Sequence, residues 1–198
     1  MRNKKVLWVA KVAILSAMAG ILMLFEFPLP FVAPGFYELD FSEVPVLIGA
    51  FALGPVAGVA IEAVKILLNF LMNGTITGGI GELSNFVLGV VFVLPAAMIY
   101  AHNKTKKNAV IGLVTGGLGM VVLGCFVNAF VMLPLYSRLM PIEAILGQAA
   151  EIWPVIDNVF LFVLLCVAPF NLIKATLVSV VTMLLYKRLS PLLKGKQL

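Results

Sequence analysis

The charged residues of this 198-residue chain lie between its apolar segments, with the basic residues grouped in some stretches and the acidic residues in others. The basic stretches contain no acidic residue; they comprise Arg2, Lys4, Lys5 and Lys11, then Lys104, Lys106 and Lys107, and finally Lys187, Arg188, Lys194 and Lys196. Seven of the nine acidic residues fall in or beside the intervening loops: Glu38, Asp40, Glu43, Glu82, Glu143, Glu151 and Asp157. Because short basic loops stay on the cytoplasmic side of a membrane, this pattern predicts a polytopic membrane protein with an even number of spans and both termini in the cytoplasm.

The composition supports a membrane protein and argues against a nucleic-acid partner. Hydrophobic residues make up 62% of the chain and charged residues 12%, against roughly 45–50% and 25% in soluble domains. At about 20 residues per span, the chain accommodates about six spans and leaves no separate soluble domain. Cytoplasmic loops account for the excess of basic residues, so no nucleic-acid partner is expected. Membrane lipid is expected to surround the protein.

The apolar runs predict an all-α fold, a six-helix transmembrane bundle that forms one membrane domain over residues 1–198. The six spans are predicted at about 6–27, 42–54, 56–72, 84–101, 109–133 and 158–188. The first run carries an A-x-A pattern like that of a signal peptide, but it continues to Phe25 and is long enough to span. As one straight helix, residues 159–186 would measure about 42 Å against a hydrocarbon core of about 30 Å. Pro169 is therefore predicted to kink this helix or to begin its spanning part.

Several polar residues within the spans are predicted to share one depth near the outer face. At about 1.5 Å per residue, Asn128 lies about 8 Å below the outer end of the fifth span. Lys174 and Asn171 lie about 20 and 24 Å from the cytoplasmic end of the last span. Asn69 and Asn85 lie near the outer ends of the third and fourth spans. Polar groups from four spans in one layer predict a pocket for a polar small molecule.

Some of these polar residues have a structural explanation of equal weight. Asn69, Asn73 and Asn85 could equally hold helices together by hydrogen bonding. Glu62 and Lys65 are three residues apart on one helix face, and we predict that they form a structural ion pair.

Lys174 is different, because no acidic residue lies one helical turn away in the sequence. A ligand or a distant carboxylate must therefore compensate its charge, which favours a functional role.

Catalytic and metal-binding motifs are missing from the sequence. His102 is the only histidine, which argues against a metal site, and there is no nucleophile–base set and no phosphate-binding loop. The sequence thus predicts a binding protein, not an enzyme, and uphill transport would need an external source of energy.

Four stretches carry a resemblance to a known family. They are Leu39-Asp40-Phe41-Ser42-Glu43-Val44-Pro45, Leu53-Gly54-Pro55, Asn128 with Leu133-Pro134-Leu135-Tyr136, and Pro169-Phe170-Asn171-Leu172-Ile173-Lys174. Over essentially its whole length, the chain resembles the riboflavin-specific S components of energy-coupling factor (ECF) transporters. The resemblance implies a six-helix membrane bundle that binds its vitamin near the outer face.

The resemblance also implies roles for individual residues. Asn128, Asn171 and Lys174 would contact the flavin ring, and the loop around Leu39 and Asp40 would meet the ribityl hydroxyls. Asn85 completes the set of predicted ligand-binding residues because of its depth. No cofactor is expected, since riboflavin would be the transported ligand.

The resemblance further implies partners. Ala13 and Ala17 match the A-x-x-x-A pattern through which S components pair with a transmembrane coupling subunit, and two ABC-type ATPases would drive the cycle. The expected location is the plasma (inner) membrane of a prokaryote. The alternatives are an S component for a different vitamin, an intramembrane enzyme, or a purely structural membrane subunit.

Overall fold

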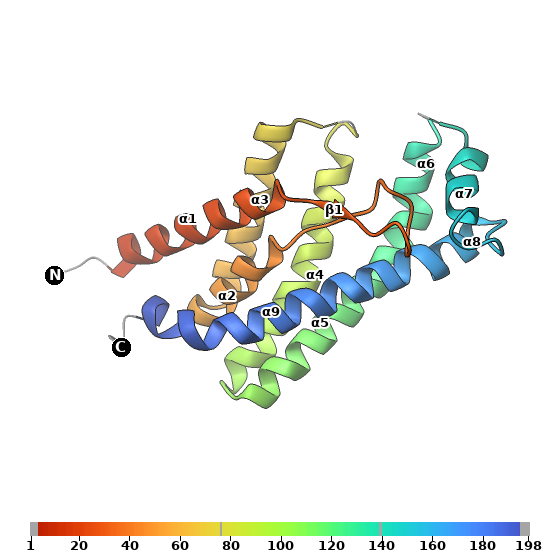
Figure 1. Ribbon diagram of the computed structural model, residues 1–198. Coiled ribbons are helices and arrows are strands. Elements are labelled where there is room, and N and C mark those ends of the chain that lie inside the picture. Colours follow the sequence, from red (N-terminus) through yellow and green to blue (C-terminus); the bar gives the residue numbers. More distant parts are fainter. Residues whose placement is uncertain (1–3, 76, 139, 195–198) are drawn as a thin grey trace.

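The computed structural model describes residues 4–75, 77–138 and 140–194, and it is a bundle of α-helices (Figure 1). The basic residues Arg2 and Lys196 of the charge pattern lie outside the described residues. Within the described ranges, five helices are long and apolar enough to cross a membrane: Lys4–Met23, Pro55–Asn73, Ile80–His102, Lys106–Tyr136 and Val159–Leu189. The prediction of an all-α membrane protein is therefore confirmed, whereas the count of six spans and the cytoplasmic termini stay predictions.

The short helix α2 (Glu43–Leu53) is the element that corresponds to the predicted second span. Its 11 residues extend about 16 Å, which is half of a hydrocarbon core. It packs against α1 (Lys4–Met23), α3 (Pro55–Asn73), α4 (Ile80–His102) and α9 (Ala168–Lys194). α2 is thus a central, largely buried helix at the crossing point of the bundle.

Two long helices contain a π turn near one end. α5 (Lys106–Val127) continues through η1 (Asn128–Met132) into α6 (Leu133–Tyr136), beyond its predicted end at Leu133. α8 (Val159–Phe162) likewise continues through η2 (Val163–Val167) into α9. A wider π turn shifts the helix register and is frequent at functional sites. The two π turns contact each other, so these irregular segments meet in the folded protein.

The α4–α5 pair packs especially closely because α5 presents glycine to its neighbour. A Cβ atom on Gly112 would lie 2.7 Å from the carbonyl oxygen of Ala96, and one on Gly116 would collide with the backbone of Phe92. The Gly112-x-x-x-Gly116 pattern therefore serves internal packing, as small residues do between membrane helices.

The outer segment, residues 24–42, crosses the bundle from the end of α1 to the region of α6 and α9 (Figure 1). Its ends are held together by the antiparallel pair β1 (Phe27–Pro28) and β2 (Glu38–Leu39). Together with α7 (Ile142–Ala150), this segment helps to form a second hydrophobic cluster that contains Leu39, Leu133 and Phe162. The main hydrophobic core lies between α1, α2, α3, α4, α5 and α9.

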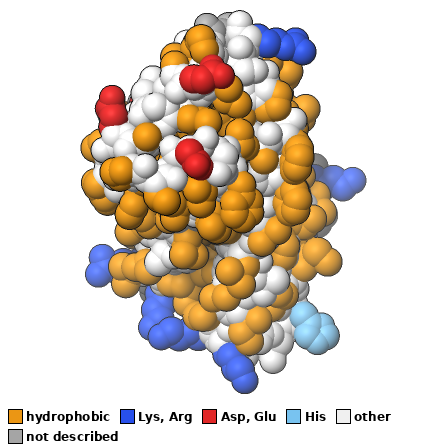
Figure 2. All heavy atoms as spheres, turned by 90° about the vertical axis from the view of Figure 1, so that its right-hand side faces the viewer, with side chains coloured by type: hydrophobic (Ala, Val, Ile, Leu, Met, Phe, Trp, Pro, Cys, Tyr) orange, Lys and Arg blue, Asp and Glu red, His pale blue; other side chains and the backbone are white. Residues whose placement is uncertain are grey.

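The charges are partly separated along the bundle. In Figure 2, acidic side chains lie in the upper half of the visible face, and several basic side chains lie at its lower edge, although a basic side chain also lies at the top. Large hydrophobic side chains such as Ile14, Leu67 and Phe160 are exposed on the helix surfaces between these ends. Exposed apolar surface on long apolar helices is expected where lipid surrounds the protein.

Candidate ligand-binding site

A small cavity of about 180 Å³ lies between the outer segment, α4, the α5–η1 junction and α9. Four of the residues that the sequence predicted for a ligand site line it: Asn85, Asn128, Asn171 and Lys174. Aromatic and apolar side chains, among them Tyr37, Phe170 and Met132, form the rest of its wall. The cavity thus combines flat apolar surfaces with a few directional polar groups, as small-molecule sites do.

Asn128 has a fixed orientation in the cavity wall. It is the first residue of η1, and its Nδ2 donates to the carbonyl oxygen of Gly124 at 2.9 Å. Its Oδ1 accepts a hydrogen bond from the hydroxyl of Tyr37 in the outer segment at 2.6 Å. The side-chain oxygen of Asn128 therefore faces the cavity as a hydrogen-bond acceptor, and in this structure Tyr37 is its donor.

Asn171 and Lys174 lie three residues apart on α9, which places them on the same face of that helix. Asn171 is buried, yet within the described parts of the chain its side chain forms no hydrogen bond. A Cβ atom on Gly124 would lie 2.6 Å from Nδ2 of Asn171, so glycine is needed there to make room for the amide. A buried amide with unused donors and acceptors at a cavity is well suited to a ligand.

A distant carboxylate compensates the charge of Lys174. Its Nζ lies 2.7 Å from Oδ2 of Asp40, and Oδ1 of Asp40 accepts from the backbone N–H of Ser42 at 2.7 Å. Burial alone would raise the pKa of Asp40, but attraction to Lys174 and then to Lys65 outweighs burial and holds that pKa well below its usual value. The pair is therefore charged, and it ties the outer segment to α9.

The predicted ion pair between Glu62 and Lys65 is confirmed, with an Oε1–Nζ distance of 2.8 Å. A second carboxylate, Glu43 at the start of α2, joins it at 2.6 Å. All three side chains are almost completely buried, so this group links α2 to α3 inside the bundle. Glu43 also lines the cavity, whereas Glu62 and Lys65 do not, so the ion group borders the cavity through Glu43.

Other polar residues do not join the cavity. Asn69 and Asn73 bond to each other at 2.9 Å near the exposed end of α3, and neither lines the cavity. The prediction that Asn69 belongs to a shared polar layer around one pocket is therefore wrong. The rise per residue gives the depth of a side chain in a helix, but the rotation of that helix against its neighbours decides where the side chain points.

The remaining predicted residues lie elsewhere. Leu39 is fully buried in the second hydrophobic cluster, and Asp40 lies behind Lys174 without lining the cavity. Ala13 and Ala17 are exposed on α1, on the opposite side of that helix from its buried residues such as Val12 and Leu15.

Tyr37, which the sequence did not predict as a site residue, covers the cavity from the outer segment. Its ring lies 5.5 Å from that of Phe170 and 6.1 Å from that of Phe162. Burial raises the pKa of its hydroxyl, so Tyr37 remains a protonated hydrogen-bond donor to Asn128. No local pattern marks this residue, because its partners lie far away in the sequence.

Two carboxyl groups meet at the ends of the outer segment. The pKa of Glu26 is raised to about 7 by partial burial, by a hydrogen bond with Glu38 and by the nearby charge of Asp40. Glu26 directly precedes β1 and Glu38 begins β2, so a shared proton reinforces the pairing of the two strands. Near neutral pH, Glu26 is therefore close to losing the proton that it shares with Glu38.

The fold defines a multi-pass membrane protein, and its small cavity brings polar and aromatic side chains together. The family described as "ECF transporter, substrate-specific component" matches residues 8–186. The chain therefore belongs to the substrate-specific, or S, components of ECF transporters. Members of this family are transporter components and not enzymes, which confirms that expectation and places the chain in a prokaryotic cell membrane with an energy-coupling module.

Individual relatives agree with this assignment. The chain is 35% identical to the riboflavin transporter RibU of Staphylococcus aureus, over 98% of this chain and 94% of that protein. It is 32% identical to the riboflavin transporter FmnP of Bacillus subtilis, over 91% of this chain and 90% of that protein. A solved structure of the S component of a bacterial ECF transporter superposes with a TM-score of 0.73 at 35% identity, covering 94% of this chain and 97% of the other.

Proposed function

We propose that this S component binds riboflavin from the outer side of the membrane and delivers it inward with an ATP-driven partner module. The observation that carries the proposal is the meeting of Asn128, Asn171 and Lys174 at one cavity with aromatic walls. The relatives named riboflavin transporters, which align over nearly the whole chain, supply the identity of the ligand.

The chemistry of the flavin ring suits these side chains. The isoalloxazine has a urea-like edge, with an N–H donor between carbonyl acceptors. An asparagine amide can donate to such an edge and accept from it at once, and a lysine ammonium can donate to a carbonyl or a ring nitrogen. The flat ring would pack on Phe170 and Tyr37, while the ribityl hydroxyls would reach the backbone near Leu39 and Asp40.

Binding requires the outer segment to move. The cavity of about 180 Å³ is smaller than the roughly 300–1,000 Å³ typical of small-molecule sites. The hydroxyl of Tyr37 donates a hydrogen bond to the side-chain oxygen of Asn128, and Asp40 forms an ion pair with Lys174. We infer that riboflavin replaces these two loop contacts with its own, so that the polar groups exchange partners and are not left unpaired.

The same proposal includes topology and partners. With α2 counted as a short sixth span, both termini and the 102–106 turn lie on the cytoplasmic side of the plasma (inner) membrane. Ala13 and Ala17, exposed on α1, contact the transmembrane coupling subunit, and two ABC-type ATPases drive the cycle. Two small exposed residues one turn apart permit a close approach of a partner helix.

The test is an absorbance spectrum of the purified protein in detergent, followed by a titration that measures quenching of riboflavin fluorescence. A yellow preparation, or saturable quenching at one riboflavin per protein, is expected. A monodisperse, folded protein that is colourless and causes no quenching would overturn the riboflavin assignment. The titration would then be repeated with other vitamins, because membership of the family does not depend on the ligand.

A further inference from the structure

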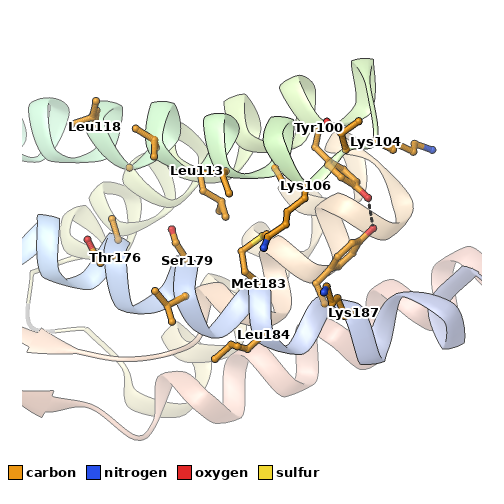
Figure 3. A pocket seen from close by; sticks show the side chains of 18 of the residues that line it. Tyr100, Lys104, Lys106, Leu113, Leu118, Thr176, Ser179, Met183, Leu184 and Lys187 are labelled. Atoms are coloured by element: carbon orange, nitrogen blue, oxygen red, sulfur yellow. Dashed lines mark hydrogen bonds between the residues drawn. The ribbon is translucent and has the colours of Figure 1, made fainter.

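A second hollow lies in the groove between α5 and α9 (Figure 3), and it shares no lining residue with the proposed riboflavin site. Its volume is about 670 Å³, and it is open to the surroundings of the bundle. Apolar side chains such as Leu113, Leu118 and Met183 line most of its length. None of its lining residues comes from α1, so the groove is separate from the surface that carries Ala13 and Ala17.

The charge of the groove is concentrated at one end. Three lysines line that end: Lys104, Lys106 and Lys187. Among the residues that the structure describes, no acidic residue lines the groove. In the parts of the chain that the structure describes, these three lysines form no ion pair. In Figure 3, the side chain of Lys106 extends from the start of α5 into the space between the two helices. Lys104 extends away from the groove in Figure 3, but three unpaired ammonium groups around one mouth favour an anionic partner.

The length of the groove matches one leaflet of a membrane. From Lys106 to Leu118, α5 advances about 18 Å, against about 15 Å for half of the hydrocarbon core. Thr176 donates to the backbone of Leu172 at 2.7 Å, and the Tyr100 and Tyr186 hydroxyls lie 3.0 Å apart at the basic end. The hydroxyl of Ser179 faces the groove (Figure 3), so the lining is apolar over most but not all of its length. The groove therefore offers a long apolar trough that ends in positive charge.

We infer that this groove binds an anionic phospholipid of the leaflet at its basic end, with an acyl chain between α5 and α9 and the phosphate among Lys104, Lys106 and Lys187. A transmembrane helix of a partner protein would need the apolar wall but not the three ammonium groups, so the charge favours a lipid. Basic groups near a membrane surface attract anionic lipids in this way. A lipid bound there would hold α5, which continues into η1 with Asn128, against α9, which carries Asn171.

The proposal predicts that purified protein retains phosphatidylglycerol and discriminates against phosphatidylcholine. The experiment is native mass spectrometry of the detergent-solubilised protein after addition of either lipid. Replacing the three groove lysines together (Lys104→Gln, Lys106→Gln, Lys187→Gln) should reduce the bound phosphatidylglycerol by about tenfold or more. The matched control removes three exposed basic charges that do not line the groove (Lys4→Gln, Lys107→Gln, Arg188→Gln). It should change binding less than about twofold, because these exposed side chains face water and are screened by salt.

A second variant tests the apolar part. Ser179 points from α9 toward α5 in Figure 3, and Ser179→Trp would fill the trough without changing any charge. This variant should also lose phosphatidylglycerol while it still binds riboflavin, which shows that the protein is folded. Equal retention of both lipids, or undiminished phosphatidylglycerol in the lysine variant, would overturn the inference. So would a cysteine at Leu118 that crosslinks to the coupling subunit in the assembled transporter, because a protein helix would then occupy the groove.

Discussion

Among the described residues two lysines are buried, Lys65 and Lys174, and their surroundings differ in a way that separates architecture from function. Lys65 is held by Glu43 and Glu62, which both lie on helices, and it does not line the cavity. Lys174 lines the cavity and is held by Asp40, which lies on the outer segment. A lysine whose partner lies on a loop can exchange that partner for a ligand, whereas a lysine enclosed by helices cannot.

The largest effect is expected from Lys65→Ala. It would leave Glu43 and Glu62 buried without a cation, and breaking a buried ion group in this way costs about 3–5 kcal/mol of stability. We expect low yield and a strongly lowered midpoint of thermal unfolding in detergent. The variant that also replaces both acids (Glu43→Gln, Glu62→Gln, Lys65→Met) should recover much of the loss, because no unpaired charge remains.

Lys174→Ala should instead affect binding far more than stability. Losing a charge-assisted contact to the flavin ring should weaken riboflavin binding about 100-fold, as measured by fluorescence titration. The unfolding midpoint should fall less than in Lys65→Ala, since the outer segment can turn Asp40 toward water. Lys107→Ala, which removes an exposed lysine that lines neither hollow, is the control and should leave riboflavin affinity unchanged. Equal affinities of Lys174→Ala and the unmodified protein would remove Lys174 from the site.

Two asparagines extend the comparison to uncharged groups. Asn171→Ala should weaken riboflavin binding about tenfold, because the amide lines the cavity and would lose its hydrogen bonds to the ring. Asn69→Ala removes an amide of the same size outside the cavity and should have no effect on the same titration. Similar losses in both variants would mean that the cavity is not the riboflavin site.

A smaller effect of opposite sign is expected for Tyr37→Phe. This change removes the hydrogen bond that competes for Asn128 but keeps the aromatic ring. Riboflavin should associate faster and bind about two- to fivefold more tightly, in line with the net value of one hydrogen bond. Stopped-flow fluorescence measures the rate, and slower association would show that Tyr37 assists binding and does not compete with the ligand.

The smallest effect concerns pH. The pKa of Glu26 is raised to about 7 in the closed outer segment, so its contribution to closure is complete below its unfolded pKa and is lost as pH rises through about 7. Riboflavin association should therefore be about two- to threefold faster at pH 8 than at pH 6. Glu26→Gln cannot release a proton and should show a flat profile over this range. A pH dependence that persists in this variant would assign the effect to another group.

The sequence predicted the class of fold and the polar part of the cavity wall on α4, η1 and α9 for physical reasons. Charge segregation and apolar length identify membrane helices without any tertiary contact. Polar residues in such helices are rare enough to be noticed, and four of those predicted (Asn85, Asn128, Asn171 and Lys174) line one cavity.

What the sequence did not reveal depends on contacts between distant segments. Asp40 lies 134 residues from Lys174, and Tyr37 lies 91 residues from Asn128. The need for glycine at position 124 follows only from the packing of α5 against Asn171. No periodicity encodes these relations, and helix rotation, which misplaced Asn69, is fixed only when the bundle packs.

The exchange of partners at Lys174 is tested most directly by an experimental structure of the protein with riboflavin bound. We predict that Nζ of Lys174 lies within hydrogen-bonding distance of the flavin ring, that the hydroxyl of Tyr37 has left Asn128, and that Lys65 keeps both Glu43 and Glu62. A structure in which riboflavin binds while Lys174 stays bonded only to Asp40 and Tyr37 stays on Asn128 would contradict this account.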